Sequence, residues 1–446
     1  MTLAPDAAFA ASTPTIASVL RRPPFLLLVA GQTMSQLGDK LQHMALIALV
    51  GAGARADSGG LELAKLSVVF TAPVVLFGPL AGALVDRWNK RLTMVVCDAL
   101  RAILVVAMPA VYATTGQLWA VYVVAFFVFL LGLFFNSAKM SLIPDLVARD
   151  ELLAANAALT SVGRVATVVG IVGGGIILGS TFWSRFGWTS YTAGFYLDSL
   201  SFLLSVVSLI GIVTLAPKRP RAATGVPEKP RPVKRSLRGL VHDVRETVGV
   251  VRRTRGLRFA FLSLILLALF AATVYVAMTV SVQTVMGRGT KGVGYLGGLL
   301  AGGMVLGSLA VGSVGGRVPR EQVIIWGTLI IGLLMVGAGF WFSFAVFVPV
   351  AVVGGAVLAP VMVAQDTLLH EHAPSDSRAV VFSTKDLMVA AVFAGSAFLI
   401  GGGIYLLGTL GVREPFRWAL GLVGVFISLT SLAVEGLSLR GRHTHS

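Results

Sequence analysis

Long apolar runs dominate the chain and recur with short polar breaks between them. Each is at least about 20 residues long, enough for an α-helix to cross a hydrocarbon core of ~30 Å. Twelve runs can be placed, in two groups of six separated by a long polar segment. They lie near residues 25–50, 62–84, 92–114, 118–142, 154–180, 191–216, 258–285, 292–316, 321–343, 345–370, 379–409 and 415–438. This pattern predicts an all-α polytopic membrane protein with two six-helix bundles around a central cavity.

Basic residues gather between the apolar runs, above all in segment 217–257. Cytoplasmic loops of membrane proteins carry an excess of Lys and Arg, so this segment is expected inside the cell. Both termini and the loop at 86–91 then also lie inside. The predicted order is a tail at 1–24, a bundle at 25–216, a linker at 217–257, a bundle at 258–438 and a tail at 439–446. Residues near 236–255 could form an amphipathic helix on the membrane surface.

Composition excludes several classes of protein. Hydrophobic residues make up 56% of the chain and charged residues 13%, which is not the balance of a soluble domain. Anionic lipid headgroups explain the net charge of +16 better than nucleic acid does. Cys97 is the single cysteine, so internal disulfides and a cysteine-based metal site are excluded. The chain has no P-loop and no catalytic constellation, so we expect no enzyme, no bound cofactor and, for a transporter, a gradient as energy source.

Polar residues recur along one side of the first span. Their spacing of four, three and four residues places them on one helical stripe, which we expect to line a central aqueous cavity: Gln32, Gln36, Asp39 and His43. A buried acid can exchange a proton between two faces, so Asp39 is the candidate proton site, with His43 as tuner or relay. The alternative is that Asp39 only pairs with a base on a neighbouring helix. Lys40 is expected to point elsewhere.

Ionisable residues inside other spans are candidates too, because charge in lipid is costly. Asp98 and Arg101 lie three residues apart in the third span, where they can pair and brace the 86–91 loop. Arg164, well inside the fifth span, needs a partner or an anionic ligand and is the candidate anion receiver. Three polar residues of the second half are singled out, one for binding and two as a gate pair: Gln283, and Asp366 with Lys385.

The stretch GPLAGALVDRWNKR, residues 78–91, ends an apolar helix in a dense group of charges. Glycines four residues apart on one helical face permit close approach of a neighbouring helix. The stretch resembles the signature loop of the major facilitator superfamily, with Asn89 where that family usually has Gly. The resemblance implies a latch that holds the two halves together in one of two states. The matching residues are Gly78, Gly82, Asp86, Arg87, Lys90 and Arg91.

The two halves resemble degenerate repeats. Residues 78–91 align with GSLAVGSVGGRVPR at 307–320, which places Gly315 opposite Asp86, so the second copy lacks the acid. SLIPDLVARDE at 141–151 likewise resembles TLLHEHAPSDS at 367–377. Parallel repeats with a binding site between them are the architecture of this transporter class.

Residues 25–438 resemble one branch of the superfamily, the macrolide- and siderophore-type exporters, in SQLGDKLQHMAL, DRWNKRLTMVVCDALRA, SLIPDLVARDELLAANA and FYLDSLSFL. Bacterial lysophospholipid transporters share several of these stretches, and Lys139 resembles their lysine at that position. Gly170 to Gly175 resembles the superfamily's antiporter motif, with Ile171 in place of Pro.

The resemblance implies a monomeric transporter of the bacterial inner membrane, working by alternating access. The leading hypothesis is proton-coupled efflux of amphipathic small molecules. A lysophospholipid flippase, with Arg164 receiving the phosphate, is the alternative. A divalent-metal exporter resembling ferroportin, with Asp39 and His43 as ligands, ranks below both, and we predict no metal site.

Overall fold

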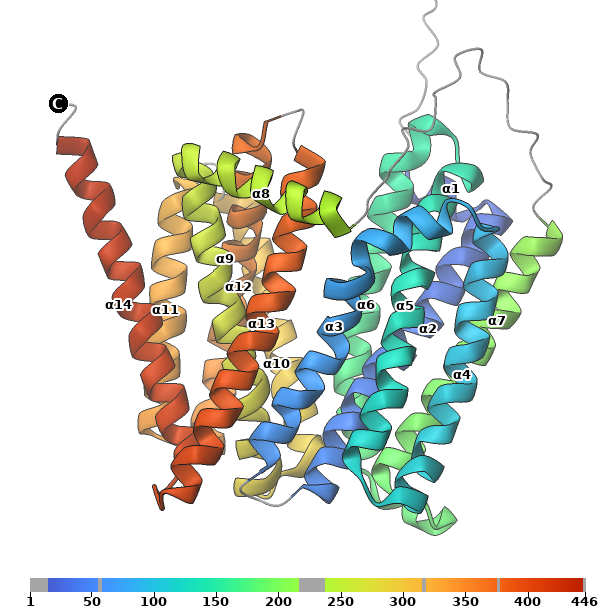
Figure 1. Ribbon diagram of the computed structural model, residues 1–446, viewed down its shortest axis with the longest axis horizontal. Coiled ribbons are helices and arrows are strands. Elements are labelled where there is room, and N and C mark those ends of the chain that lie inside the picture. Colours follow the sequence, from blue (N-terminus) through green and yellow to red (C-terminus); the bar gives the residue numbers. More distant parts are fainter. Residues whose placement is uncertain (1–14, 55–57, 216–236, 315–317, 375–377, 444–446) are drawn as a thin grey trace, which may run out of the picture.

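The structure, a computed structural model, describes residues 15–54, 58–215, 237–314, 318–374 and 378–443, and it is built almost wholly of helices (Figure 1). The first half comprises α1 (Ile16–Leu20), α2 (Pro23–Gly53), α3 (Gly59–Val85), α4 (Lys90–Thr115), α5 (Leu118–Leu146), η1 (Arg149–Glu151), α6 (Leu152–Leu178), η2 (Thr181–Phe186) and α7 (Ser190–Leu215). The second comprises α8 (Leu237–Arg253), α9 (Arg255–Thr273), the π-helical turns η3 (Val274–Met278) and η4 (Ser281–Val285), α10 (Gly289–Val314), α11 (Arg320–Phe340), α12 (Phe344–His372), α13 (Arg378–Thr409) and α14 (Pro415–His443).

Eleven helices in the described part of the chain are long and apolar enough to cross a membrane, with α9, η3 and η4 counted as one. The twelfth, α2, has 31 residues but carries the polar residues of the predicted stripe. It packs between α6 and α7 inside the first bundle. These helices begin and end within a few residues of the predicted runs, except that α14 continues to His443. The predicted fold is confirmed, and α2 is less apolar because it faces the protein interior.

The two bundles, α2–α7 and α9–α14, meet at one end of the molecule and diverge at the other (Figure 1). We call the end that carries α8 the linker side and the opposite end the distal side. On the distal side α6 and α10 touch backbone to backbone at Gly175 and Gly294. Gly401 of α13 approaches Gly60 of α3 in the same way. A side chain at Gly175, Gly294 or Gly401 would clash with the facing backbone and push the bundles apart, so glycine at these positions permits the distal closure.

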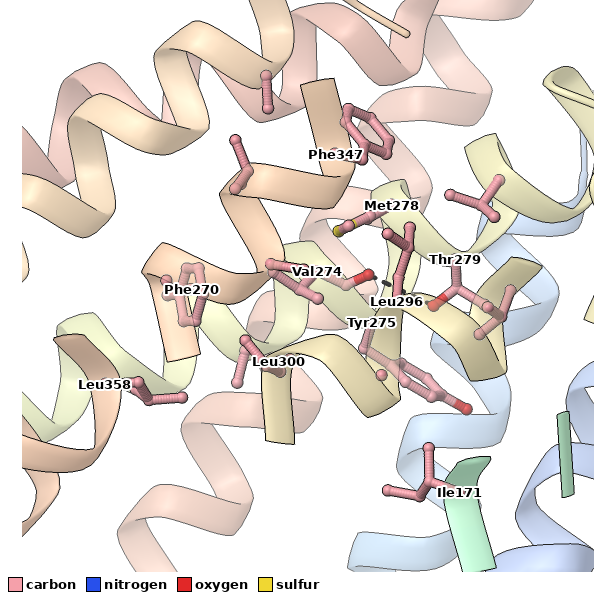
Figure 2. Close-up of a pocket in the computed structure, with 18 of the residues that line it drawn as sticks. Ile171, Phe270, Val274, Tyr275, Met278, Thr279, Leu296, Leu300, Phe347 and Leu358 are labelled. Atoms are coloured by element: carbon pink, nitrogen blue, oxygen red, sulfur yellow. Dashed lines mark hydrogen bonds between the residues drawn. The ribbon is translucent and has the colours of Figure 1, made fainter. Parts of the chain in front are cut away.

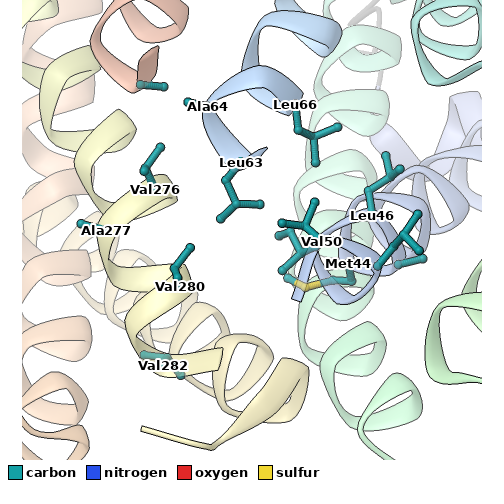
Figure 3. Close-up of a cluster of buried hydrophobic side chains, with 14 of the residues drawn as sticks. Met44, Leu46, Val50, Leu63, Ala64, Leu66, Val276, Ala277, Val280 and Val282 are labelled. Atoms are coloured by element: carbon teal, nitrogen blue, oxygen red, sulfur yellow. The ribbon is translucent and has the colours of Figure 1, made fainter. Parts of the chain in front are cut away.

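Apolar side chains complete this distal seal (Figure 3). Leu63 of α3 faces Val276 and Val280 of the second bundle, and all three are buried. One hydrogen bond also crosses between the halves: Gln283 Nε2 in η4 donates to the Ile47 carbonyl of α2 at 3.0 Å. The distal side is therefore closed by packing and by a side-chain-to-backbone bond.

Helix α8 is the surface helix expected near residues 236–255, and it lies across the linker side of the second bundle (Figure 1). Thr247 is buried and shares a hydrogen bond of 3.0 Å with Thr384 of α13. Val250 and Val251 pack against the apolar core of α9, α12 and α13. Arg252 and Arg253 remain exposed. The helix is thus fixed to the second bundle and presents its charges outward, while linker residues 216–236 lie outside the described residues.

Candidate functional site

A cluster of buried charges lies inside the first bundle and is centred on Arg101 of α4. Its guanidinium donates hydrogen bonds to Asp98 Oδ1 at 3.2 Å, to Ser35 Oγ at 3.3 Å and to Asp39 Oδ1. The ring of Phe202 lies beneath it, 4.0 Å from Cζ. A buried guanidinium is stable only when its charge is compensated, and these contacts supply that compensation, while the Nε of Arg101 has no hydrogen-bond partner in the described structure.

Two further charged residues belong to the cluster. Asp198 of α7 is fully buried, accepts a hydrogen bond from Ser201 Oγ at 3.3 Å and interacts electrostatically with Arg101. Lys139 of α5 is 5% exposed and interacts electrostatically with Asp39. The cluster therefore holds three carboxylates against two cations. Of these carboxylates Asp39 alone reaches solvent, because its side chain is 34% exposed whereas Asp98 and Asp198 are fully buried.

This arrangement corrects one prediction. Asp98 and Arg101 do pair, but they join Asp39 at mid-bundle instead of bracing the 86–91 loop, whose described contacts go elsewhere. Lys139, which the resemblance to lysophospholipid transporters singled out, is a buried member of the same cluster. The reason is packing: Gly38 sits against Asp198 and Ser201, which brings α2 close to α7. The structure contains the arrangement given as the alternative, in which Asp39 pairs with a base on a neighbouring helix.

The polar stripe of α2 does not line one cavity. Gln32 is buried, and the amide of Gln36 packs against Gly163 of α6. The ring of His43 lies among aromatic rings, 5.4 Å from Phe70 and 5.6 Å from Tyr275 between centroids. A helix inside a bundle meets a different neighbour on each part of its surface, so one stripe is divided between several surroundings.

An elongated cavity of about 500 Å³ opens beside His43 and extends into the second bundle (Figure 2). Its walls come mainly from α9, η3, α10, α11 and α12, and they are almost entirely aliphatic or aromatic. Figure 2 shows the hydroxyl of Tyr275 at the end near Ile171 of α6, with Phe347 and Leu358 farther away. That hydroxyl is buried and bonds to no other described group. Such a volume suits a small organic ligand, since ligand pockets span about 300–1,000 Å³.

Lys40 lines this cavity, contrary to the expectation that it points elsewhere. The aliphatic part of the Lys40 side chain packs against Gly170 of α6, and Lys40 forms no ion pair among the described residues. Sequence reasoning missed Lys40 and Tyr275 as site residues. A signal for Lys40 existed: residues three apart on a helix are neighbours, so Lys40 shares a side of α2 with His43.

The glycines of the antiporter-like stretch in α6 serve two interfaces. Gly170 and Gly174 pack against Lys40 and Met44 of α2, while Gly175 meets Gly294 of α10. Arg164 lies on the same face as Ile171 and Gly175, two turns toward the linker side, where the bundles diverge. It is exposed, and it has no partner among the described residues. Its role as an anion receiver stays a prediction.

The 86–91 loop contacts only its own bundle in the described structure. Lys90 Nζ pairs with Asp145 at 3.1 Å, and Asp86 accepts a hydrogen bond from Ser141 at 3.3 Å. Asn89 caps α4 by accepting from the Leu92 amide. Arg87 is exposed, and Arg91 is partly buried.

The close helix approach predicted at Gly78 and Gly82 is absent. A side chain at Gly82 would meet nothing within 4 Å, and one at Gly78 would meet only Val74 of its own helix. The halves stand apart on this side (Figure 1), and the role of the loop as a latch stays a prediction.

The predicted pair in the second bundle is present, with Lys385 Nζ 3.2 Å from Asp366 Oδ1. Both residues belong to the same bundle, so the pair joins α12 to α13 and not one half to the other. Arg320 and Glu371 form a similar exposed pair at 3.1 Å. Gln283, predicted as a binding residue, lies in the distal seal and outside the cavity lining.

Asp39 and His43 do not form a metal site in the described structure. Asp39 bonds to Arg101, and the ring of His43 is enclosed by aromatic rings. Among the described residues no group of three or more His, Cys, Asp or Glu is placed to hold a metal ion. The geometry gives no support to the metal-exporter hypothesis.

Comparison with known proteins gives consistent results. The profile of the Major Facilitator Superfamily matches residues 28–384. An uncharacterized MFS-type transporter, YfiS of Bacillus subtilis (strain 168), is 27% identical over 182 residues, which cover 41% of this chain and 40% of that relative. An uncharacterized MFS-type transporter of Mycobacterium tuberculosis is 27% identical over 153 residues, 34% of this chain and 35% of its own length. The aligned segments thus span less than half of these relatives.

Solved structures share the fold across almost the whole chain. A bacterial homologue of the human lysosomal transporter Spinster, inward-facing and unoccupied, superposes with a TM-score of 0.70 at 15% identity, covering 96% of this chain and 98% of its own. An inward-facing bacterial homologue of the iron transporter ferroportin gives 0.69 at 13% identity, covering 93% and 98%. At such identities the likeness concerns the fold alone.

Proposed function

The chain belongs to the major facilitator superfamily and is an MFS-type transporter, and we propose that it exports amphipathic small molecules across the bacterial inner membrane by exchange for protons. We place the linker side in the cytoplasm, because the basic residues of α8 and of the 86–91 loop lie there. The described state is then open to the cytoplasm and closed at the distal side.

The observation that carries the proton coupling is the unequal charge of the Arg101 cluster. Asp39, Asp98 and Asp198 face Arg101 and Lys139, so one carboxylate is in excess when all are ionised. A buried excess charge is costly, and one bound proton removes it. Asp39 is the carboxylate that can exchange this proton with its surroundings outside the cluster, because its side chain alone of the three is exposed.

Protonation of Asp39 is expected to alter the position of α2. A neutral carboxyl no longer forms an ion pair with Arg101, so the bond between α2 and α4 weakens. Helix α2 also carries Lys40 and His43 on the cavity wall and accepts the bond from Gln283 at the distal seal. Proton and substrate thus act on one helix, and each can favour a different state of it.

Transport in proteoliposomes with and without an inward-acid pH gradient tests the proposal. Amphipathic dyes of either charge and macrolides are the probes, and Asp39→Asn is the central variant. We expect gradient-driven transport in the parent protein and its loss in Asp39→Asn. Asp366→Asn makes the same chemical change at a carboxylate outside the cluster and should keep transport. Gradient-driven transport that survives in Asp39→Asn would refute the assigned proton site.

A second candidate function, inward transport of lysophospholipid, is favoured by Arg164. This exposed cation faces the space between the halves without a described partner, as a receptor for a phosphate would. Movement of a spin-labelled lysophospholipid that ignores the pH gradient and is lost in Arg164→Gln would establish this function in place of export. Retention of that movement in Arg164→Gln would dismiss the assigned phosphate site.

A further inference from the structure

We infer that the cavity of the second bundle binds the alkyl chain of a single-chain amphiphile whose anionic head is held by Lys40 at the boundary between the halves. This inference rests on the proposed transport function and names its substrate class. Two features of the cavity support it: the unpaired ammonium of Lys40 in its lining, and the apolar walls of the rest of the cavity.

The polar end of the cavity lacks an anion. Lys40 lies near the middle of α2, the most costly depth for a charge, and it has no ion-pair partner in the described part of the chain. The nearest acid in sequence, Asp39, is already bonded to Arg101. Tyr275 also lines the cavity, and its hydroxyl is buried and unbonded in the described structure. The ammonium of Lys40 provides charged donors for an oxyanion, and a bound oxyanion supplies the counter-charge that Lys40 lacks.

The remainder of the cavity is almost entirely apolar. Leu300, Met335 and Leu358 line it, and Figure 2 shows Phe347 and Leu358 far from the Tyr275 hydroxyl. A volume of about 500 Å³ lies within the usual range of small-ligand pockets and has room for an alkyl chain. The walls offer a charged head no partners, so the chain enters and the head stays at Lys40.

Photochemical labelling in lipid nanodiscs tests the inference without transport or a gradient. The probe is an alkyl sulfonate with a diazirine in its chain, and the matched probe is the alkylammonium of the same length. Labelled peptides are identified by mass spectrometry. We expect the sulfonate to label α10 and α12 in competition with unlabelled alkyl sulfonate, and the ammonium to label them at least about tenfold less, since Lys40 repels it.

Variants locate the head and the chain separately. Lys40→Gln is expected to lower sulfonate labelling at least about tenfold, as for loss of a charge-assisted hydrogen bond, and Lys40→Arg to retain most of it. Lys65→Gln removes a cation of α3 outside the cavity lining and should change nothing. Gly354→Leu fills the cavity, because a Cβ there already meets Leu334 at 4.0 Å, and should abolish labelling. Gly402→Leu, in open space on α13, is its control.

Three results would overturn the inference: equal labelling by both probes, labelling of segments that do not line the cavity, or dependence on Arg164 but not on Lys40. Because the measurement needs no gradient, its outcome is separable from that of the proposed function. If labelling is lost in Lys40→Gln but transport is unchanged in Asp39→Asn, only the proposed proton coupling is refuted. If transport is driven by the gradient but the cavity is not labelled, only the assignment of the substrate class is refuted.

Discussion

The two bundles share a fold and traces of a repeated sequence, yet their interiors are opposite in character. The first contains a cluster of five charged side chains, with Arg101 at its centre. In the described part of the second, the buried polar groups are amides and hydroxyls, such as Gln365 bonded to Ser263 at 3.0 Å, and no charged side chain is buried. The second bundle contains an apolar cavity instead, beside a helix interrupted by π-helical turns. In the proposed function the proton therefore belongs to one half and the apolar part of the substrate to the other.

The π-helical turns explain how one repeat can hold a cavity. Such turns add a residue to a helical turn and occur often at functional sites. In the second bundle η3 supplies Val274, Tyr275 and Met278 to the cavity wall. Its counterpart α2 in the first bundle is regular throughout and packs tightly on α6 and α7. The irregular helix of the second bundle therefore lies beside the cavity, and the regular helix of the first bundle contributes to the charged cluster.

The largest expected effect comes from removing the centre of the charged interior. Arg101→Leu leaves three carboxylates buried with only Lys139 near them, so we expect a loss of about 3–5 kcal/mol in stability and no transport. Unfolding of the purified protein in a denaturing detergent titration measures it. Lys65→Leu, which breaks an exposed pair with Glu62, is the control and should cost below about 1 kcal/mol. Equal losses in the two variants would show that the cluster is not the basis of the first bundle's stability.

The next effect concerns the distal contact between the halves. Gly175→Val places a side chain against the backbone of Gly294, which forces α6 and α10 apart and disfavours the distally closed state. Spin labels at Asp150 and Ser383, both on the linker side, should then approach each other as the linker side closes. Gly173→Val meets nothing within 4 Å and should leave the distance distribution unchanged. An unchanged distribution in Gly175→Val would contradict the role of this contact.

A smaller shift in the same direction is expected for Gln283→Ala. The variant loses one hydrogen bond to the Ile47 carbonyl, worth about 1 kcal/mol, so the ratio of the two states should change roughly fivefold. The same pair of spin labels measures it, and Gln322→Ala, on the exposed start of α11, provides a control amide. A shift as large as that of Gly175→Val would mean that the bond, and not the helix contact, holds the distal side closed.

The sequence predicted the helices well because apolar length and basic loops are local properties. It could not predict which side chains meet. From the sequence, Asp98 and Arg101 could satisfy each other's charge, yet Asp39 joins them because glycine at position 38 lets α2 pack closely against α7. The cavity could not be predicted either, since it depends on how far four helices stand apart. Lys40 is partly predictable from the sequence. Its charge and its depth in the span can be read from the sequence, but the direction of its side chain depends on the presence of Gly170 of α6 beside it.

The smallest effects on stability separate the linker-side loops of the two repeats. Lys90–Asp145 and Arg320–Glu371 are exposed pairs of similar length in corresponding segments, so Lys90→Ala and Arg320→Ala should each cost below about 1 kcal/mol. Transport should nevertheless distinguish them. Asp86 lies beside Lys90, whereas the second repeat has Gly315 at the matching position, so only the first loop has both an acid and bases for a latch. We therefore expect Lys90→Ala to slow transport several-fold and Arg320→Ala to leave it near the parent rate, because closing the linker side brings only the first loop into contact with the opposite bundle. Equal transport rates in the two variants would show that the repeats act alike here, and that the loss of the acid carries no functional difference.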